Sequence, residues 1–210
     1  MKIMTPTVMP ASHLSREESL ALIERAGRTC YKSEDKMHDD SAPRFIKNVV
    51  KSGHLSVIEH VSVSFRIWCS RACSHQIVRH RIASYSQQSQ RYVKEGDELS
   101  VVVPPEIAKD PKALAALEIA VDSAAETYHT LVEVFKQKPE DARYILPNCV
   151  VTELVMTANL REWLHFIELR SSMKAQWEIR DIAQQIKIQI EARLPELFGG
   201  SNKIERKVEK

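Results

Sequence analysis

The stretch Val61-Ser-Val-Ser-Phe-Arg-Ile-Trp-Cys-Ser70 carries the clearest secondary-structure signal of the chain. Hydrophobic residues occupy every second position from Val61 to Ile67, with serine, arginine or tryptophan between them. This period of two predicts a β-strand with one buried face. Ser70 is of the residue type that caps helices, so we expect the strand to lead directly into a helix over residues 71–80.

On the N-terminal side of this strand the pattern predicts one further strand and two helices. Residues 2–8 are expected to be extended. The capping box Ser15-Arg-Glu-Glu18 begins a helix that we expect to end near Gly27. A second helix is predicted from Ser41-Ala-Pro43, with proline in its first turn, to Gly53.

On the C-terminal side, strands and helices follow one another without a regular βαβ alternation. Strands are expected at residues 91–93, 99–103 and 149–156, and helices at 110–136, at 160–169 after an Asn159 cap, and from a Ser171 or Ser172 cap to Gly199-Gly200. This order predicts an α+β fold with a mixed or antiparallel sheet packed against helices, with long helices in the middle and at the C-terminus, and not a Rossmann fold. No linker divides the sequence, so we expect one domain over residues 1–210 with a loose tail at 201–210.

Composition excludes several classes of protein. The chain has only five glycines, and none stands in a G-x-G-x-x-G or P-loop arrangement. No apolar run approaches the ~20 residues of a membrane span, and the first ten residues do not form a signal peptide. We therefore expect a cytoplasmic protein with no membrane partner.

The cysteines and histidines do not have the spacing of metal ligands. No C-x-x-C pair occurs among the four cysteines, which are Cys30, Cys69, Cys73 and Cys149. His75 and His80 are five residues apart and would not share a helix face. We expect reduced thiols and no metal site.

Charge is concentrated although the net charge is only +2. Residues 61–94, called the basic stretch below, contain no Asp or Glu and six cations, namely Arg66, Arg71, Arg79, Arg81, Arg91 and Lys94. Such a local field favours an anionic ligand. The alternative is that these cations pair with carboxylates from other parts of the fold.

The residues from Arg79 to Arg91 add a chemical signature to this charge. Three arginines and His80 stand beside serine and glutamine side chains. Guanidinium groups bind phosphate oxygens in a bidentate manner, and hydroxyl and amide groups hydrogen-bond to heterocycle edges. The composition predicts a site for a phosphorylated heterocycle.

Arg79-His80-Arg81 followed by Ser89 resembles the R-H-R-x7-S signature of the flavin-dependent thymidylate synthases. Further matches stand in the expected order, from about residue 50 to 180: Ser52-Gly53-His54, Glu59-His60, Arg143 before Leu146-Pro147, Asn159-Leu-Arg161, and Arg170 before Ala175-Gln176-Trp177-Glu178. The resemblance implies reductive methylation of deoxyuridine monophosphate to thymidylate. FAD would be the cofactor, with NADPH and methylenetetrahydrofolate as co-substrates, in a homotetramer whose subunits share active sites and which needs no nucleic acid.

The resemblance also implies roles for individual residues. The nucleotide would be held by Gln76, Ile77, Val78, Arg79, Gln87, Gln88, Ser89, Gln90, Arg91, Arg143 and Arg170. FAD would contact Ser56, Arg79, His80, Arg81, Ile82, Gln87, Asn159, Leu160, Arg161 and His165. Two positions differ from some family members, since Gln87 can be Glu and His165 can be Asn.

Two residues are candidates for the chemistry itself. Arg170 would lie against the uracil ring and stabilise negative charge that develops there, as a catalytic residue that requires no enzyme nucleophile. Ser89 has no adjacent His/Asp pair in sequence, so we interpret its hydroxyl as a hydrogen-bonding group rather than a nucleophile. Two alternatives remain open: a non-catalytic RNA-binding module that uses the basic stretch, and a flavoenzyme that acts on another uracil nucleotide, such as one in RNA.

Overall fold

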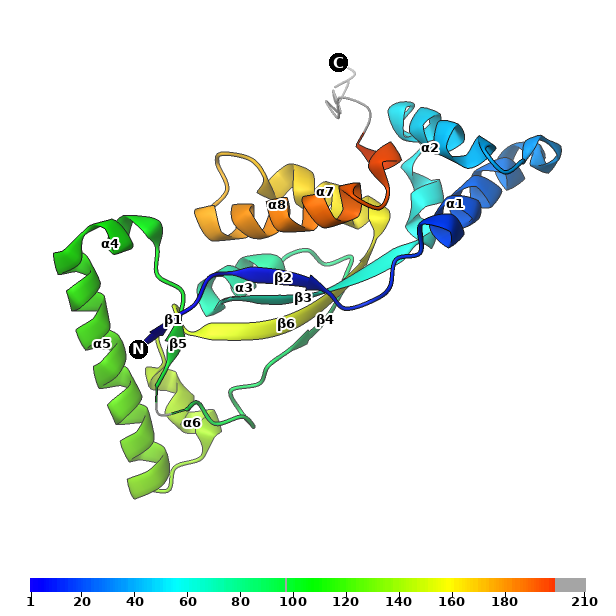
Figure 1. Cartoon of the computed structure of the whole chain (residues 1–210). Coiled ribbons are helices and arrows are strands. Elements are labelled where there is room, and N and C mark those ends of the chain that lie inside the picture. Colours follow the sequence, from blue (N-terminus) through cyan, green and yellow to red (C-terminus); the bar gives the residue numbers. More distant parts are fainter. Residues whose placement is uncertain (97, 199–210) are drawn as a thin grey trace, which may run out of the picture.

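A four-stranded antiparallel sheet forms the centre of the molecule (Figure 1). The structure is a computed structural model that describes residues 1–96 and 98–198. In this sheet the strands follow the order β2 (Thr7–Pro10), β3 (Ser62–Ser70), β6 (Val151–Asn159) and β4 (Ser84–Gln87). A parallel pair, β1 (Lys2–Ile3) with β5 (Ser100–Val101), is separate from it. The predicted α+β class is confirmed.

The strand predicted from residue alternation is the central one. β3 pairs with β6 over all nine residues, from Ser62 opposite Asn159 to Ser70 opposite Val151. Its alternate residues enter the main core, where Phe65 meets the ring of Trp163 edge to face with centroids 5.1 Å apart. The period of two therefore identified both the strand and its buried face.

Helices gather over the sheet and at its two ends (Figure 1). α7 (Leu160–Arg170) and α8 (Trp177–Glu191) lie over one face, and α3 (Arg71–Ile77) follows β3 directly and contacts α8. α1 (Arg16–Tyr31) and α2 (Ser41–Lys51) lie at one end of the molecule. At the other end are α4 (Pro105–Lys109), α5 (Pro111–His129) and α6 (Pro139–Ala142).

Short turns of helix complete the described segments. Four are 3₁₀ turns, at Glu34–Lys36, Leu55–His60, Arg143–Ile145 and Pro195–Leu197, and a π turn at Thr130–Val134 follows α5. In the described part of the chain, no helix combines the length and the apolar character that crossing a bilayer would require.

Several helix boundaries follow the predicted caps. The Ser15 hydroxyl accepts from the backbone N–H of Glu18, and the Ser70 hydroxyl accepts from that of Cys73. α1 continues past Gly27 to Tyr31. A side chain at position 27 would collide with the Phe45 ring, so glycine serves there as a small residue rather than as a helix stop. Gly53 follows α2 with φ of +80°, the left-handed conformation that glycine adopts without strain.

Other predicted boundaries are wrong. Residues 2–8 form two strands in different sheets, separated by Pro6, rather than one strand. Residues 91–93 form a turn in which the backbone N–H groups of Tyr92 and Val93 donate to the Ser89 carbonyl. β4, in residues expected to be irregular, was missed.

The two ends of the last helix also differ from the prediction. Gln176, and not Ser171 or Ser172, caps α8, because its side-chain carbonyl accepts from the backbone N–H groups of Glu178 and Ile179. The helix ends at Glu191. The expected stop at Gly199-Gly200 and the expected tail at 201–210 lie outside the described residues.

Candidate active site

Arg170, the last residue of α7, is held by two groups from the end of α3. Its Nε donates to Nε2 of His80 at 3.0 Å, and its Nη2 donates to the backbone carbonyl of Gln76 at 3.3 Å. α7 begins where the Asn159 side chain accepts from the backbone N–H of Glu162, and it then folds back over the sheet toward α3. The fold thus joins residues that are about ninety positions apart in sequence.

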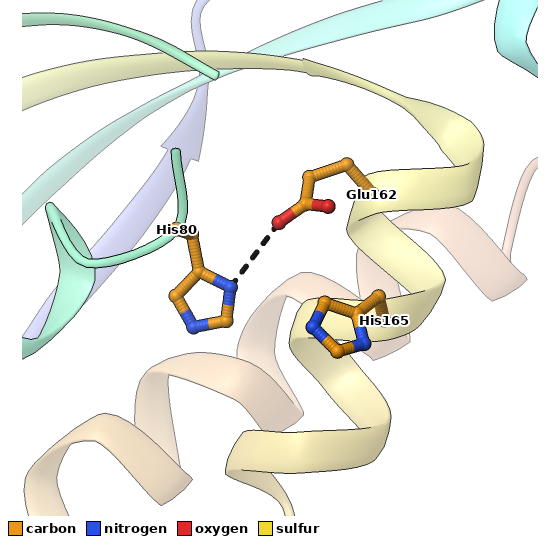
Figure 2. A group of neighbouring side chains, drawn as sticks. All are labelled: His80, Glu162 and His165. Atoms are coloured by element: carbon orange, nitrogen blue, oxygen red, sulfur yellow. Dashed lines mark hydrogen bonds and ion pairs between the residues drawn. The ribbon is translucent and has the colours of Figure 1, made fainter. Parts of the chain in front are cut away.

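His80 is the centre of a polar cluster in which His80 and Glu162 are buried and His165 is exposed (Figure 2). Its side chain is almost wholly buried, and its Nδ1 lies 3.2 Å from Oε1 of Glu162. The imidazole also packs near the rings of Phe166 and His165, with centroids 4.7 Å and 5.9 Å away. The ring is therefore fixed on both nitrogens and on its faces.

Burial dominates the electrostatics of this cluster. It lowers the pKa of His80 to about 4, with further lowering from Arg170 and His165. Burial also raises the pKa of Glu162, although His165 acts in the opposite direction. At neutral pH the imidazole of His80 is thus uncharged beside the Arg170 guanidinium.

The cluster has the composition of a small metal site. His80, Glu162 and His165 each offer one ligand atom, and these atoms lie within 4.8 Å of one another. The sequence spacing that we considered, His75 with His80, did not point to this group. The expectation that the protein holds no metal stays a prediction.

The loop after His80 is tied to α3 and to the sheet. The Tyr85 hydroxyl donates to the backbone carbonyls of His80 and Ile77, at 2.6 Å and 3.0 Å. The side-chain amide of Gln87 donates to the hydroxyls of Ser74 and Thr152, both at 3.1 Å. These hydrogen bonds of Tyr85 and Gln87 fix the start of the loop that carries the other predicted nucleotide-binding residues.

Ser89 sits in a turn rather than in a nucleophilic arrangement. Its Oγ accepts from the backbone N–H of Arg91 at 3.2 Å. Arg91 in turn donates to the Glu140 carboxylate at 2.5 Å. Across residues 1–96 and 98–198, Ser89 has no histidine or carboxylate partner, which favours a hydrogen-bonding role.

Two predicted nucleotide-binding residues, Gln90 and Arg143, line a polar pocket of about 260 Å³. Arg71 and His75, which were not predicted as site residues, line the same pocket. Arg71 donates to the Gln88 carbonyl at 3.2 Å and to Thr152 Oγ1 at 3.1 Å, and burial lowers its pKa. Its place in the basic stretch was the signal that could have identified it.

Four of the ten predicted cofactor residues line a second pocket, of about 490 Å³. They are Ile82, Asn159, Arg161 and His165. The adjoining pocket, of about 680 Å³, includes Arg170 and shares His165 and Glu168 with it. The two pockets therefore follow one side of α7, with Arg161 near its start and Arg170 at its end.

Other predicted residues lie elsewhere. Ser56 lines a separate pocket of about 230 Å³ together with Tyr31 and His54. Ile77 and Leu160 are buried in the main core, where their side chains serve packing. Val78, Arg79 and Arg81 are exposed and line none of the four pockets described above.

Half of the cations in the basic stretch have carboxylate partners. Arg66 pairs with Glu153, Arg91 with Glu140, and Lys94 with Glu133. Among the residues that the structure describes, Arg71, Arg79 and Arg81 have none. The unpaired cations are therefore concentrated around α3 and the start of the R-H-R segment.

Most of the chain matches a known protein family. The model of the Thy1 family, described as thymidylate synthase complementing protein, matches residues 13–196. Proteins named flavin-dependent thymidylate synthase are similar over 85% of this chain: one from Mycobacteroides abscessus is 40% identical over 196 residues, and one from Geobacter sulfurreducens is 41% identical over 186. These alignments cover 78% and 80% of the two relatives. The chain belongs to this family of flavin-dependent enzymes, as its signature predicted.

A solved structure has the same fold. The UMP/dUMP methylase PolB from Streptomyces cacaoi, bound with 5-Br dUMP, superposes with a TM-score of 0.81 over 94% of this chain and 95% of that one. The two sequences are 23% identical. A protein of known structure therefore has the same α+β fold as this chain.

Proposed function

We propose that this protein converts deoxyuridine monophosphate to thymidylate, with methylenetetrahydrofolate as the one-carbon donor and NADPH as the source of electrons. The observation that carries the proposal is the fixed guanidinium of Arg170, which borders the 680 Å³ pocket in a chain of the flavin-dependent thymidylate synthase family. A cation fixed in the wall of a pocket can stabilise negative charge on a bound ring.

Arg170 acts as an electrostatic catalyst in this proposal. Uracil becomes nucleophilic at C5 when negative charge develops on its ring, and a preorganised guanidinium stabilises that charge as it forms. An arginine keeps its proton under ordinary conditions, so it supports the charge without acting as a base. The contacts to His80 and to the Gln76 carbonyl hold the group in one orientation before substrate arrives.

The described residues fit a flavin cofactor along α7. Pocket volumes of about 490 and 680 Å³ lie within the range of small-molecule sites, ~300–1,000 Å³. Ile82, 70% exposed, offers an apolar surface for a ring. Arg161 pairs with Glu59 in the same pocket, and it would have to exchange this carboxylate for a pyrophosphate oxygen when the cofactor binds. Asn159, whose side-chain oxygen already caps α7, still has an amide donor to contribute. When bound, FAD would supply the hydride chemistry, and the chain would orient the rings.

The distribution of these residues supports a homotetramer with shared sites. Arg143 precedes β6 and Asn159 ends it, and a nine-residue strand spans roughly 27 Å. The exposed Arg79 and Arg81 face neither flavin pocket of their own chain. We propose that a second subunit brings such cations to the cofactor and substrate.

The test combines a spectrum with an assay. The purified protein is expected to carry visible flavin absorption, to oxidise NADPH, and to form thymidylate from deoxyuridine monophosphate and methylenetetrahydrofolate. A protein without flavin that takes up no added FAD would contradict the proposal. If the protein methylates uracil in RNA but does not turn over free deoxyuridine monophosphate, then RNA and not the free nucleotide is its substrate.

A further inference from the structure

A line of hydrogen bonds runs from the third residue of α7 to its last residue by way of His80, three residues after the end of α3. Glu162 contacts Nδ1 of His80 at 3.2 Å, and Nε2 of the same ring accepts from Arg170 at 3.0 Å. His80 and Glu162 are 5% and 6% exposed. On the basis of the proposed function, we propose that Glu162 is a positioning residue, which fixes the proton of His80 on Nδ1 so that Nε2 can hold Arg170.

The hydrogen-bonding capacity of each group leaves one arrangement. A guanidinium has donors only, so Nε2 of His80 must accept from Arg170. A neutral imidazole with a bare Nε2 carries its proton on Nδ1, which must then donate to Glu162. The carboxylate accepts that bond, and the opposite tautomer would place two N–H groups against each other at the Arg170 end.

Other protonation states disrupt this line. An imidazolium would direct a second N–H at the Arg170 guanidinium, and the burial that lowers the pKa of His80 opposes that state. A protonated Glu162 keeps a carbonyl oxygen that can accept from Nδ1–H, but its hydroxyl can also donate to a bare Nδ1, which would place the ring proton on Nε2. An ionised Glu162 only accepts, so it is the state that fixes the ring proton on Nδ1 and keeps the Arg170 contact. The other titratable side chain against the ring is His165.

The same hydrogen-bonding argument bears on whether His80, Glu162 and His165 could bind a metal ion. A metal bound through Nδ1 of His80 needs the lone pair of that nitrogen, which places the remaining proton on Nε2. That proton would face the Arg170 Nε–H. Coordination by His80, Glu162 and His165 and the observed bond to Arg170 therefore exclude each other.

The expected effect of Glu162 is on the chemical step. Misplacement of a catalytic group by about 1 Å costs on the order of a hundredfold in rate. We expect Glu162→Ala to lower kcat by roughly that factor, and Glu162→Gln, whose amide oxygen still accepts from Nδ1–H, by roughly tenfold or less. The loss in kcat should exceed any rise in KM for deoxyuridine monophosphate, because Arg170 is only one of several residues predicted to hold the nucleotide. Flavin content should stay within about twofold, although Glu162 lines the 490 Å³ pocket, because its carboxylate is directed to His80.

A matched control is available in α1. Glu24 is also a buried carboxylate, and it accepts from Arg28 on its own helix and from the Ser41 hydroxyl. Glu24→Gln should leave kcat unchanged within about twofold, even if it lowers stability. A loss of kcat equal to that of Glu162→Gln would show a general effect of neutralising a buried carboxylate, and would overturn the proposal.

A spectroscopic readout tests the proposal without activity. With ¹⁵N-labelled histidine in the flavin-loaded protein, His80 is expected to show a protonated Nδ1 and a bare Nε2, and Glu162→Ala should redistribute the proton. A wild-type His80 protonated on Nε2 would overturn the proposal, as would stoichiometric Zn²⁺ that shifts His80 and His165 together. If the tautomer is as expected but no thymidylate forms, the proposed function fails and this positioning arrangement stands.

Discussion

Two buried glutamates, Glu162 and Glu178, differ in what lies beyond their partners. Both are less than one-tenth exposed, and burial raises the pKa of both. Glu178 accepts from the backbone N–H of Ser70 at 2.7 Å and from its hydroxyl at 2.6 Å, at the corner where β3 becomes α3. Glu162 contacts His80, which holds Arg170 at a pocket. Burial alone therefore does not separate a structural carboxylate from a functional one. The difference is that His80, the partner of Glu162, also holds a residue at a pocket, whereas Ser70, the partner of Glu178, only begins a helix.

The largest expected effect concerns Arg170, at the end of the hydrogen bonds that run from Glu162 through His80. Arg170→Ala should lower kcat by on the order of 10²–10³-fold, the typical loss when one preorganised donor to a developing charge is removed. Flavin content should remain, because the predicted cofactor residues on α7 are unchanged. Steady-state assays and absorption spectra check both, and Arg44→Ala, at an exposed position of α2, is the control. Retention of activity would remove the basis for linking Glu162 to catalysis.

Glu178 should show the opposite profile. Glu178→Ala leaves the Ser70 N–H without its acceptor and removes a charge-assisted bond, so we expect the free energy of unfolding to fall by about 3 kcal/mol. Urea unfolding measures this loss. The kcat of the folded fraction should change less than in Glu162→Gln. A variant with normal stability and much lower kcat would break the distinction between the two glutamates.

The pH dependence of stability should report on the His80 side of this comparison, because the fold lowers the pKa of His80 and raises the pKa of both glutamates. The pKa of His80 is about 4 in the fold against an ordinary 6.5. The unfolded chain therefore binds the proton first, and the stabilisation is fully present above about pH 6.5 and is lost as the pH falls through about 4. At most ~3 kcal/mol is involved.

His80→Asn, which removes the titrating group, should make stability less dependent on pH over this range. Urea unfolding of wild type and variant at several pH values measures the difference, and Glu24→Gln is the control for an unrelated buried site. Identical pH profiles for wild type and His80→Asn would mean that His80 is not held neutral by the fold.

Local patterns carried much of the fold. The alternation in residues 61–67 identified the central strand, and Ser15, Ser70 and Asn159 each cap the helix that was predicted to follow them. The misses are places where tertiary contacts decide. β4 forms because β6 offers it a partner strand, and Gly27 stands within α1 as a small residue because Phe45 fills the space beside it.

The candidate site was predictable only where the resemblance to a family named its residues. That resemblance named Arg170 and His80, which the structure joins by a hydrogen bond, and the loop that includes Gln87. It did not reveal Glu162, which at the third position of a helix has the pattern of a capping residue. Asn159 in fact provides the cap, and the Glu162 side chain is directed to His80 instead. Such a connection depends on how α7 is placed against the segment that follows α3, which no local pattern contains.

Ser89 should give the smallest effect, because its hydroxyl has one backbone partner and no general base among the described residues. One hydrogen bond contributes about 0.5–1.5 kcal/mol net, so Ser89→Ala should lower kcat/KM by roughly two- to tenfold. The change should lie mainly in KM, since we place the residue in nucleotide binding, and Ser86→Ala, exposed on β4, is the control. Complete loss of turnover with nucleotide affinity intact would indicate covalent catalysis by Ser89. It would also shift the centre of the chemistry from Arg170 to the loop.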